Sequence, residues 1–300
     1  MTTPMRQQYL NLKKQHPDAI LFFRLGDFYE TFDDDAKIVS QICEITLTSR
    51  PVAKGLRVPL AGVPHHAVET YIARLIKAGY KVALVEQSDS GDRSLMHRQV
   101  VQVVTPGTIT EESLLSPKSN NYLVALVANP HCSALAYADI STGEFAAEEY
   151  TGTDATALHD VLTRLQAAEC VVMDTDEIAR RVAEGLAIPI ATVEASHVSL
   201  PRAREILLEH FTTDTLTPFG IEQHEGATQA AALCILYLQK TQSSAVASLD
   251  SLRFDTGRRF MHLDQTAQRN LELIQSSQGN TEGSLLSVID HTLTPMGARL

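Results

Sequence analysis

Residues 19–32 read AILFFRLGDFYETF, and this stretch decides the local fold of the first part of the chain. The apolar run at its start predicts a buried strand near 19–25. The acidic and aromatic residues that follow predict a helix from about 28 to 46.

Local chemistry supports that predicted helix. Asp27 is a good helix cap, and Glu30 stands three residues later, as in a capping box. Phe28 then packs against Phe32, four residues on, as a staple. This reading makes Phe28 a packing residue. The apolar face of the predicted helix contains Phe32, Ala36, Val39 and Cys43.

The surrounding sequence alternates helical and strand patterns up to a polar, aperiodic stretch at 110–121, where we place a boundary. Thr3 caps the first predicted helix, and Gly79 ends the third. The pattern predicts a compact α/β unit. Its other predicted elements are a helix near 4–15, an amphipathic helix over 65–80, and strands over 81–87 and 98–109.

Basic residues gather in SRPVAKGLRVP, residues 49–59, which reads as a loop because of its Pro and Gly content. Arg50, Lys54 and Arg57 give this stretch the chemistry of a phosphate-contacting segment, or of an ordinary solvated loop. The net charge of the chain is −11, which disfavours nucleic acid as a partner of the whole surface. Residues 1–118, however, contain 14 Lys or Arg against 13 Asp or Glu, so only this third can approach a polyanion at low cost.

Length and composition suggest about two globular domains in 300 residues, with 44% hydrophobic residues. The charged N-terminus lacks the apolar core of a signal peptide, and no apolar run approaches the roughly 18 residues of a membrane span. The cysteines form no C-x-x-C pair, which fits reduced thiols. We expect a cytoplasmic protein without a membrane partner. The four cysteines are Cys43, Cys132, Cys170 and Cys234.

The second part of the chain begins with three strand-like runs at 121–130, 132–140 and 143–150, which predict an antiparallel meander. Helical and strand patterns then alternate up to a long helix over 226–242. From about 250 the pattern changes again. A helix that opens at Thr294-Pro295 stops after one turn, which is typical of a truncated chain.

Catalytic motifs are scarce. No phosphate-binding G-x-x-x-x-G-K-[ST] loop occurs, and the adjacent His65 and His66 cannot share a metal on one helix face. One alternative stays open. Asp139, with Glu144 and either Asp174 or Asp176, would form a divalent-metal nuclease centre in an RNase H-like sheet, or Asp139 simply opens the Ser141-Thr142-Gly143 turn.

Several stretches in a fixed order resemble the MutS family of bacterial DNA mismatch-repair proteins, from about residue 18 to the end. They are GDFYE, DDAK, PLAGVPHHAVETYIARLIKAGYKVALVEQ, VTPGTI, DISTGEF, AQRNLELIQ and TPMGARL. The resemblance implies an α/β fold class with three pieces. These are a mixed-sheet mismatch-binding domain (1–115), an RNase H-like connector domain (120–245) and the start of an all-helical core domain (250–300).

The resemblance implies that Phe28 and Glu30 read the mispair, while Tyr29 stays with packing. A ring wedged against a base gains roughly 1–3 kcal/mol of stacking, and unstacking costs least where pairing is already defective. A carboxylate among phosphates is repelled, so Glu30 helps only where an unpaired base donates a hydrogen bond to it. The other residues expected at DNA are Arg50, Lys54, Arg57, Pro59, Leu60 and Pro64.

The resemblance also implies which partners this segment has and that it holds no cofactor. Mismatched duplex DNA is the expected ligand, MutL the expected protein partner through the connector, and a homodimer the expected state of the full-length protein, with this segment monomeric. We expect no cofactor here, because ATP and magnesium belong to an ATPase domain beyond Leu300. Two alternatives remain: a metal-dependent nuclease built on Asp139, and a segment that chiefly docks MutL.

Overall fold

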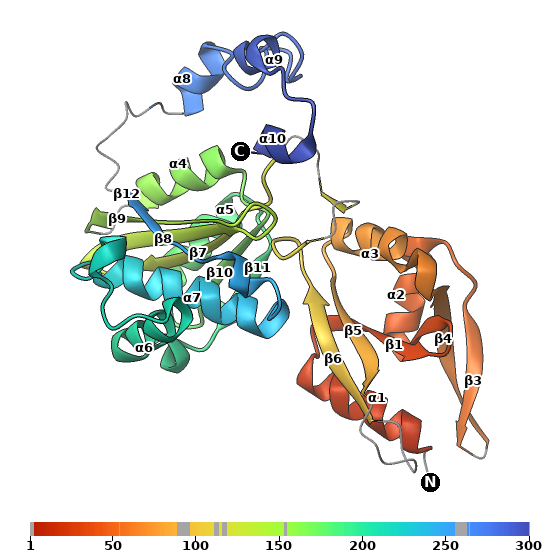
Figure 1. Ribbon diagram of the computed structural model, residues 1–300. Helices are drawn as coiled ribbons and strands as arrows, with labels where there is room; N and C mark the ends of the chain where they lie inside the picture. Colours follow the sequence, from red (N-terminus) through yellow and green to blue (C-terminus); the bar gives the residue numbers. More distant parts are fainter. Residues whose placement is uncertain are drawn as a thin grey trace. The chain divides into compact units, whose positions relative to one another are not determined.

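The computed structural model describes residues 3–53, 55–88, 97–110, 114–115, 119–152, 155–255, 263 and 265–299. The chain divides into two compact units (Figure 1). The first unit comprises Met1–Pro106 with Lys240–Ser243, and the second comprises Gly107–Gln239 with Ser244–Leu300. The predicted domain limits, 1–115, 120–245 and 250–300, stay predictions.

A mixed six-stranded sheet forms the centre of the first unit, in the order β3-β4-β2-β1-β5-β6. β1 and β5 run parallel, and the other neighbours are antiparallel. The strands are β1 (Ala19–Leu25), β2 (Phe28–Phe32), β3 (Thr48–Ala53), β4 (Leu56–Pro64), β5 (Lys81–Ser88) and β6 (His97–Val104). The helices are α1 (Pro4–Gln15), α2 (Asp33–Cys43), the 3-10 turn η1 (His65–Ala67) and α3 (Val68–Lys77).

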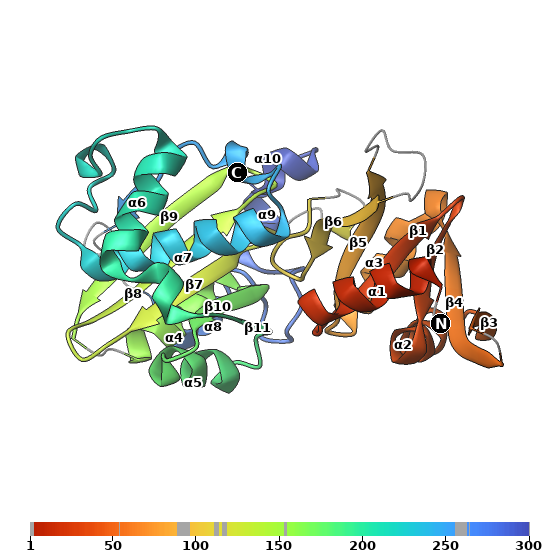
Figure 2. The same ribbon diagram turned by 90° about the horizontal axis from the view of Figure 1, so that it is seen from below.

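Both faces of this sheet are buried over most of its area. Tyr9 of α1 packs edge-on against Phe23 and Phe32, with ring centroids 5.8 and 4.9 Å away. Because side chains alternate along a strand, Phe22 and Ala61 lie on the opposite face, where they are also buried. Figure 2 shows α1 lying along the sheet beside β1 and β2.

The predicted helix over 28–46 is wrong at its start, because Phe28–Phe32 is strand β2 and the helix begins only at Asp33. β2 is flanked on both sides by partners, β1 and β4. The ladder bonds that these partners supply outweigh the local capping signal. The expected capping box and the Phe28–Phe32 staple are therefore absent, and Phe32 itself is the cap residue, without a side-chain cap bond.

The predicted loop over 49–59 is also wrong, because most of it forms the antiparallel pair of β3 and β4. Gly55 adopts a φ of +77° at the connection, a conformation that glycine reaches without strain. Arg50 and Arg57 therefore stand on strands, in consecutive pairs of a regular register (Arg50 with Val58, Pro51 with Arg57), and the register shifts only beyond these pairs, between Pro51 and Ala53. Lys54 lies outside the described residues.

The other predicted elements of the first unit are confirmed. The helix near 4–15 is α1, and the Thr3 hydroxyl accepts a hydrogen bond from the Arg6 amide at 3.4 Å. The helix over 65–80 is η1 followed by α3, and it ends before Gly79, whose φ is +86°.

The second unit is built on another six-stranded sheet, in the order β11-β10-β7-β8-β9-β12. β7, β8 and β9 form the predicted antiparallel meander, β10 and β11 join parallel to β7, and β12 runs parallel to β9. This arrangement is the expected RNase H-like sheet with an added edge strand. The strands are β7 (Leu123–Ala128), β8 (Cys132–Asp139), β9 (Glu144–Thr151), β10 (Glu169–Met173), β11 (Ile190–Val193) and β12 (Arg253–Asp255).

Helices cover both faces of this second sheet (Figures 1 and 2). One apolar cluster joins Leu123 and Ala125 to α6 and α7, and the other joins Val124 and Leu126 to α4 and α5. The sequence pattern did not predict α6. The helices are α4 (Ala155–Leu165), α5 (Glu177–Gly185), α6 (Leu200–Phe211) and α7 (Glu225–Thr241), with the short turns η3 (Ala195–Val198), η4 (Thr217–Phe219) and η5 (Val246–Ser248).

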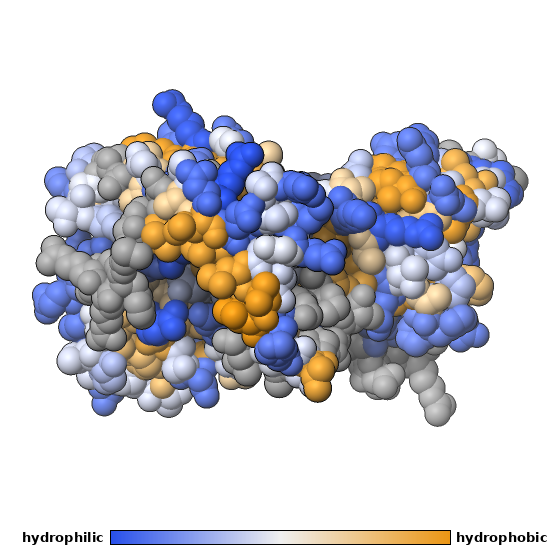
Figure 3. All heavy atoms as spheres, turned by 90° about the horizontal axis from the view of Figure 1, so that it is seen from above, coloured by the Kyte–Doolittle hydropathy of each residue, from blue (hydrophilic) through white to orange (hydrophobic). Residues whose placement is uncertain are grey.

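Three short helices follow: α8 (Gln265–Asn270), α9 (Leu285–Ile289) and α10 (Pro295–Arg299). Apolar side chains on and around α8 and α9 are exposed, and Figure 3 shows an apolar patch over this part of the chain. They include Leu271, Ile274, Leu285, Leu286, Val288, Ile289 and Leu293. Among the residues that the structure describes, no helix is both long and apolar enough to span a membrane.

Candidate nucleic-acid interface

The hairpin between β1 and β2 places Phe28 at the exposed end of its strand. Leu25 pairs with Phe28, so the turn consists of Gly26 and Asp27 alone, and Gly26 has a φ of +60°. This is the tight hairpin turn that favours glycine at its first position. The Asp27 carbonyl also accepts a hydrogen bond from the His65 amide at 2.9 Å. With the turn fixed, the Phe28 ring is 47% exposed.

Tyr29 points to the opposite face of β2 and anchors the strand. Its ring is buried and packs beside Phe22, with 6.1 Å between the centroids. The Tyr29 hydroxyl donates a hydrogen bond to Glu86, which also lies 3.8 Å from the Arg24 guanidinium. Burial, and then the Glu86 carboxylate, raise the pKa of Tyr29 to about 12. Tyr29 is thus a neutral packing residue, as predicted.

Glu30 lies on the same face as Phe28, because the two are separated by one residue in a strand. The Glu30 carboxylate forms an ion pair with the Arg50 guanidinium, which reaches across β4 from β3. The side chains of Glu30 and Arg50 are 19% and 40% exposed. The pair is therefore partly shielded from solvent but open to a ligand.

The register of β4 decides which other predicted residues join this face. Pro64 stands opposite Phe28, and Leu60 stands opposite Phe32, so both share the face of Phe28 and Glu30. We call the set Phe28, Glu30, Arg50, Leu60 and Pro64 the reading face.

Two predicted residues lie elsewhere. Pro59 and Arg57 alternate with Leu60 and Val58 along β4, which puts their side chains on the other side of the hairpin. Arg57 donates hydrogen bonds to the Ser49 carbonyl and hydroxyl oxygens, at 2.6 and 2.9 Å. The structure therefore separates Arg57 and Pro59 from the reading face.

Gly62 stands between Leu60 and Pro64 on the same side of β4, so we add it to the reading face. The sequence pattern did not point to it. It pairs with Glu30 across β2 and β4. An atom at its absent Cβ position would lie 3.8 Å from Glu30 Cγ and 3.9 Å from Phe28 Cδ1. The signal that could have found it is a glycine inside a strand pattern, VPLAGVP.

Asp139 opens the Ser141-Thr142-Gly143 turn, which was the alternative to a nuclease centre. It is fully buried, and its carboxylate accepts hydrogen bonds from the Asn121 amide at 3.0 Å and from the Ser141 amide and hydroxyl at 2.9 and 2.6 Å. Its carbonyl accepts a bond from Gly143, whose φ is +79°. These contacts engage both carboxylate oxygens, one by the turn itself and the other by Asn121, which precedes β7.

The acids of the alternative nuclease centre are divided between two ends of the sheet, because Asp139 pairs with Glu144 at one end while Asp176 lies at the other. Asp139 lies by the start of β7, where Leu123 pairs with Ala138. Asp176 accepts a bond from the Ala128 amide, at the other end of β7 and about 15–20 Å away at the rise of a strand. Among the described residues, no group of three or more His, Cys, Asp or Glu side chains could hold a metal ion.

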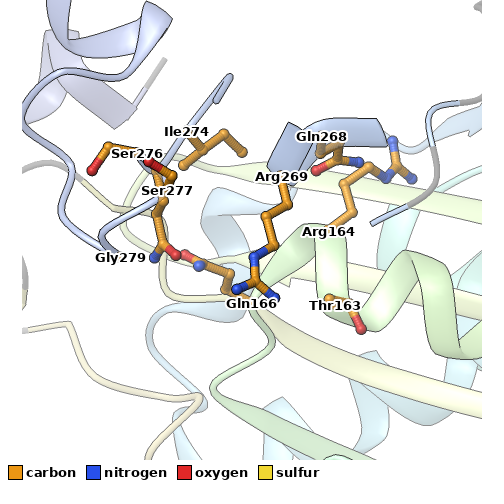
Figure 4. Close-up of a pocket in the computed structure, with 10 residues that line it drawn as sticks. Thr163, Arg164, Gln166, Gln268, Arg269, Ile274, Ser276, Ser277 and Gly279 are labelled. Carbon is orange, nitrogen blue, oxygen red and sulfur yellow. The ribbon is translucent and has the colours of Figure 1, made fainter. Parts of the chain in front are cut away.

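A separate cavity of about 300 Å³ lies in the second unit between α4 and the segment around α8 (Figure 4). Arg164 and Arg269 give it a basic character, but Arg164 already forms an ion pair with Glu148 at 2.9 Å. Its other lining side chains are mostly amides and hydroxyls, which are no specific mark of a ligand. The reading face remains the stronger candidate.

Comparison with protein families matches almost the whole described chain. Residues 3–113 match MutS domain I, residues 121–252 match MutS domain II, and residues 266–300 match MutS domain III. The reading face therefore lies within the domain I match, and the strands β7 to β11 of the RNase H-like sheet lie within the domain II match.

Similar curated proteins carry one name, DNA mismatch repair protein MutS. The protein from Dehalococcoides mccartyi (strain CBDB1) is 43% identical over 302 residues, covering 100% of this chain and 35% of its own length. That from Symbiobacterium thermophilum is 43% identical over 307 residues, covering 99% and 35%. The chain thus spans about a third of the length of the curated relatives it matches. By its sequence and its domain matches, this chain belongs to the MutS family.

Proposed function

We propose that the first unit recognises mispaired or unpaired bases in duplex DNA by inserting Phe28 at the lesion and accepting a base hydrogen bond on Glu30. The observation that carries the proposal is the exposure of Phe28, 47%, beside a carboxylate on the same strand face. An exposed ring held by a tight turn on a buried sheet is already oriented for contact, so little ordering is needed on binding.

Stacking supplies the discrimination for Phe28. Insertion of an aromatic ring costs the free energy of unstacking a base step, and stacking of the ring on one base contributes roughly 1–3 kcal/mol in return. A defective pair lowers the unstacking cost, whereas an intact pair does not. The same ring therefore binds better at a mispair without reading a particular sequence.

Arg50 makes Glu30 compatible with a polyanion. A lone carboxylate near phosphates is repelled, but the guanidinium of Arg50 brings the net charge of the pair to zero. A base that has lost its partner can then donate a hydrogen bond from its Watson–Crick edge to Glu30, whereas in an intact pair the donors of that edge are already bonded to the other base. Arg50 is free to turn toward a phosphate once the base contacts Glu30.

The relatives carry the name of a DNA mismatch repair protein, and this name supports extending the proposal to mismatch repair. In this scheme the second unit is the connector that contacts MutL. The full-length protein acts as a homodimer, with ATP and magnesium bound by sequence that follows residue 300. The segment itself then serves recognition and carries no catalytic group.

The test compares duplexes that contain a G·T mispair with fully paired duplexes, by fluorescence anisotropy at fixed salt. The protein is used intact, with any sequence that follows residue 300 retained. Phe28→Ala is expected to weaken binding to the G·T duplex roughly tenfold, the loss of one stacked base, and to leave binding to paired DNA almost unchanged. Equal loss on both duplexes, or no loss, contradicts the proposal.

Val101→Ala is the matched control. Val101 is 48% exposed and stands on β6, separated from β2 by β1 and β5 in the same sheet. Removing this apolar side chain is expected to leave both affinities as they are in the wild type.

A further inference from the structure

Gly62 occupies a position where the protein itself gives no reason for glycine. Its φ lies outside the left-handed range, and the pairing of β2 with β4 runs from Phe28–Pro64 to Phe32–Leu60 without a bulge. A Cβ added to Gly62 would meet its neighbours at 3.7–3.9 Å, which is ordinary van der Waals contact. An alanine fits here without strain.

Several other glycines of the described chain have an internal reason. Gly26 and Gly55 adopt positive φ in turns. A Cβ on Gly107 would come within 2.9 Å of Glu169 and Leu123, and one on Gly226 within 2.6 Å of Cys132. Gly62 meets neither condition, although glycine weakens the interior of a strand.

The space that Gly62 leaves open lies on the reading face. Its absent side chain would stand 3.8 Å from Glu30 Cγ and 3.9 Å from Phe28 Cδ1, so it would fill the gap between the exposed ring and the carboxylate. A glycine inside a strand, when no bulge or tight bend requires it, marks a place where a ligand approaches the backbone closely.

We infer that Gly62 is a specificity-determining residue: it forms the floor of a recess in which one nucleobase lies flat, with its face on Phe28 and its edge toward Glu30. The inference rests on the proposed function and adds the steric requirement that this function places on β4. A side chain at position 62 lifts the base away from the strand. The base then loses either the stacking contact or the hydrogen bond.

The test uses Gly62→Ala and Gly62→Val in the intact protein, with anisotropy on G·T and fully paired duplexes. Affinity for the G·T duplex is expected to fall stepwise, by roughly tenfold or more for Val, as when one base no longer stacks. Affinity for paired DNA is expected to stay within about twofold, because phosphate contacts away from position 62 dominate there. Thermal unfolding reports whether the sheet is intact. A wild-type or higher midpoint is expected, since both residues suit a strand better than glycine.

Gly185→Ala is the control, because Gly185 also has space around it and lies on helix α5 in the second unit. An unchanged preference for G·T in Gly62→Val overturns the inference. If Val unfolds the protein, an unchanged preference in the folded Ala variant does the same. A wild-type protein without any preference for G·T contradicts the proposed function instead, so the two failures are distinguishable.

Discussion

Glu30 and Arg50 form one functional group at the residue scale. The ion pair is half-exposed, so its worth to folding is small, about 0–1 kcal/mol for pairs of this kind. Its worth to binding is larger in our account, because the charge that Arg50 cancels would otherwise face phosphates at every site on DNA. The pair is thus placed to tune affinity for paired DNA as well as discrimination.

A double-mutant cycle tests this coupling. Glu30→Ala is expected to raise affinity for fully paired duplex and to compress the ratio between G·T and paired DNA. Arg50→Gln is expected to weaken binding to both duplexes several-fold, about 1 kcal/mol, by leaving the carboxylate uncancelled. In the Glu30→Ala background the same Arg50 change should cost much less. Strict additivity of the two changes in anisotropy measurements contradicts the coupling.

The β1–β2 hairpin shows, at the element scale, where local sequence chemistry fails. Asp27 and Glu30 satisfy the spacing of a capping box, but Phe28 and Glu30 share one face of a strand while Tyr29 is buried on the other. Two flanking strands supply partners that no local pattern reveals. The letters FYETF do not alternate apolar and polar residues, and Thr31 and Phe32 are both buried, so the sequence held no strand signal to set against the cap signal.

Elements with longer patterns were predictable. The periodic helices α1, α3 and α7 and the meander of β7, β8 and β9 all follow from their apolar spacing. By contrast, the placement of Arg50 and Arg57, from the basic stretch 49–59, on opposite faces of the sheet was not predictable. Whether Arg50 and Arg57 share a face depends on the strand register, which pairs Arg50 with Val58 and Arg57 with Pro51 and which sequence alone does not fix.

The turn that presents Phe28 depends on Gly26. Any other L-residue at a φ of +60° is strained, so Gly26→Ala is expected to lower the free energy of unfolding by about 1–2 kcal/mol. It should also reduce the preference for G·T, because the ring is no longer held in place. Urea unfolding followed by circular dichroism measures the first effect.

Gly185→Ala is the control for the urea experiment, because the opposite effect on stability is expected. Gly185 has no positive φ and ends helix α5, where alanine is the better helix former, so stability should stay level or rise. A Gly26→Ala protein as stable as the wild type would show that the turn is not strained by a side chain.

Charge is distributed unevenly over the whole molecule. Residues 1–118 are near neutral, while the rest of the chain contains 11 Lys or Arg against 23 Asp or Glu. DNA is therefore expected to contact the first unit through few phosphates, which predicts weak and salt-sensitive binding by this segment alone. Arg57 lies off the reading face, so we expect it to contact phosphate and not to recognise bases.

Arg57→Gln separates these two contributions. It should lower affinity for G·T and paired duplexes by the same factor and reduce the slope of log affinity against log salt by about 0.9. Lys77→Gln makes the same charge change at an exposed position in the last turn of α3, and should alter neither. A change in the G·T preference of Arg57→Gln would place Arg57 at the bases.

Photo-crosslinking tests the central claim most directly, because it reports contact between Phe28 and the base. The intact protein is bound to duplex that carries 5-iodouracil in the mispair and irradiated, and the crosslinked peptide is identified by mass spectrometry. The account predicts a crosslink at Phe28 that disappears when the analogue is moved several base pairs from the mispair. A bound complex that crosslinks elsewhere and never at Phe28 would contradict it.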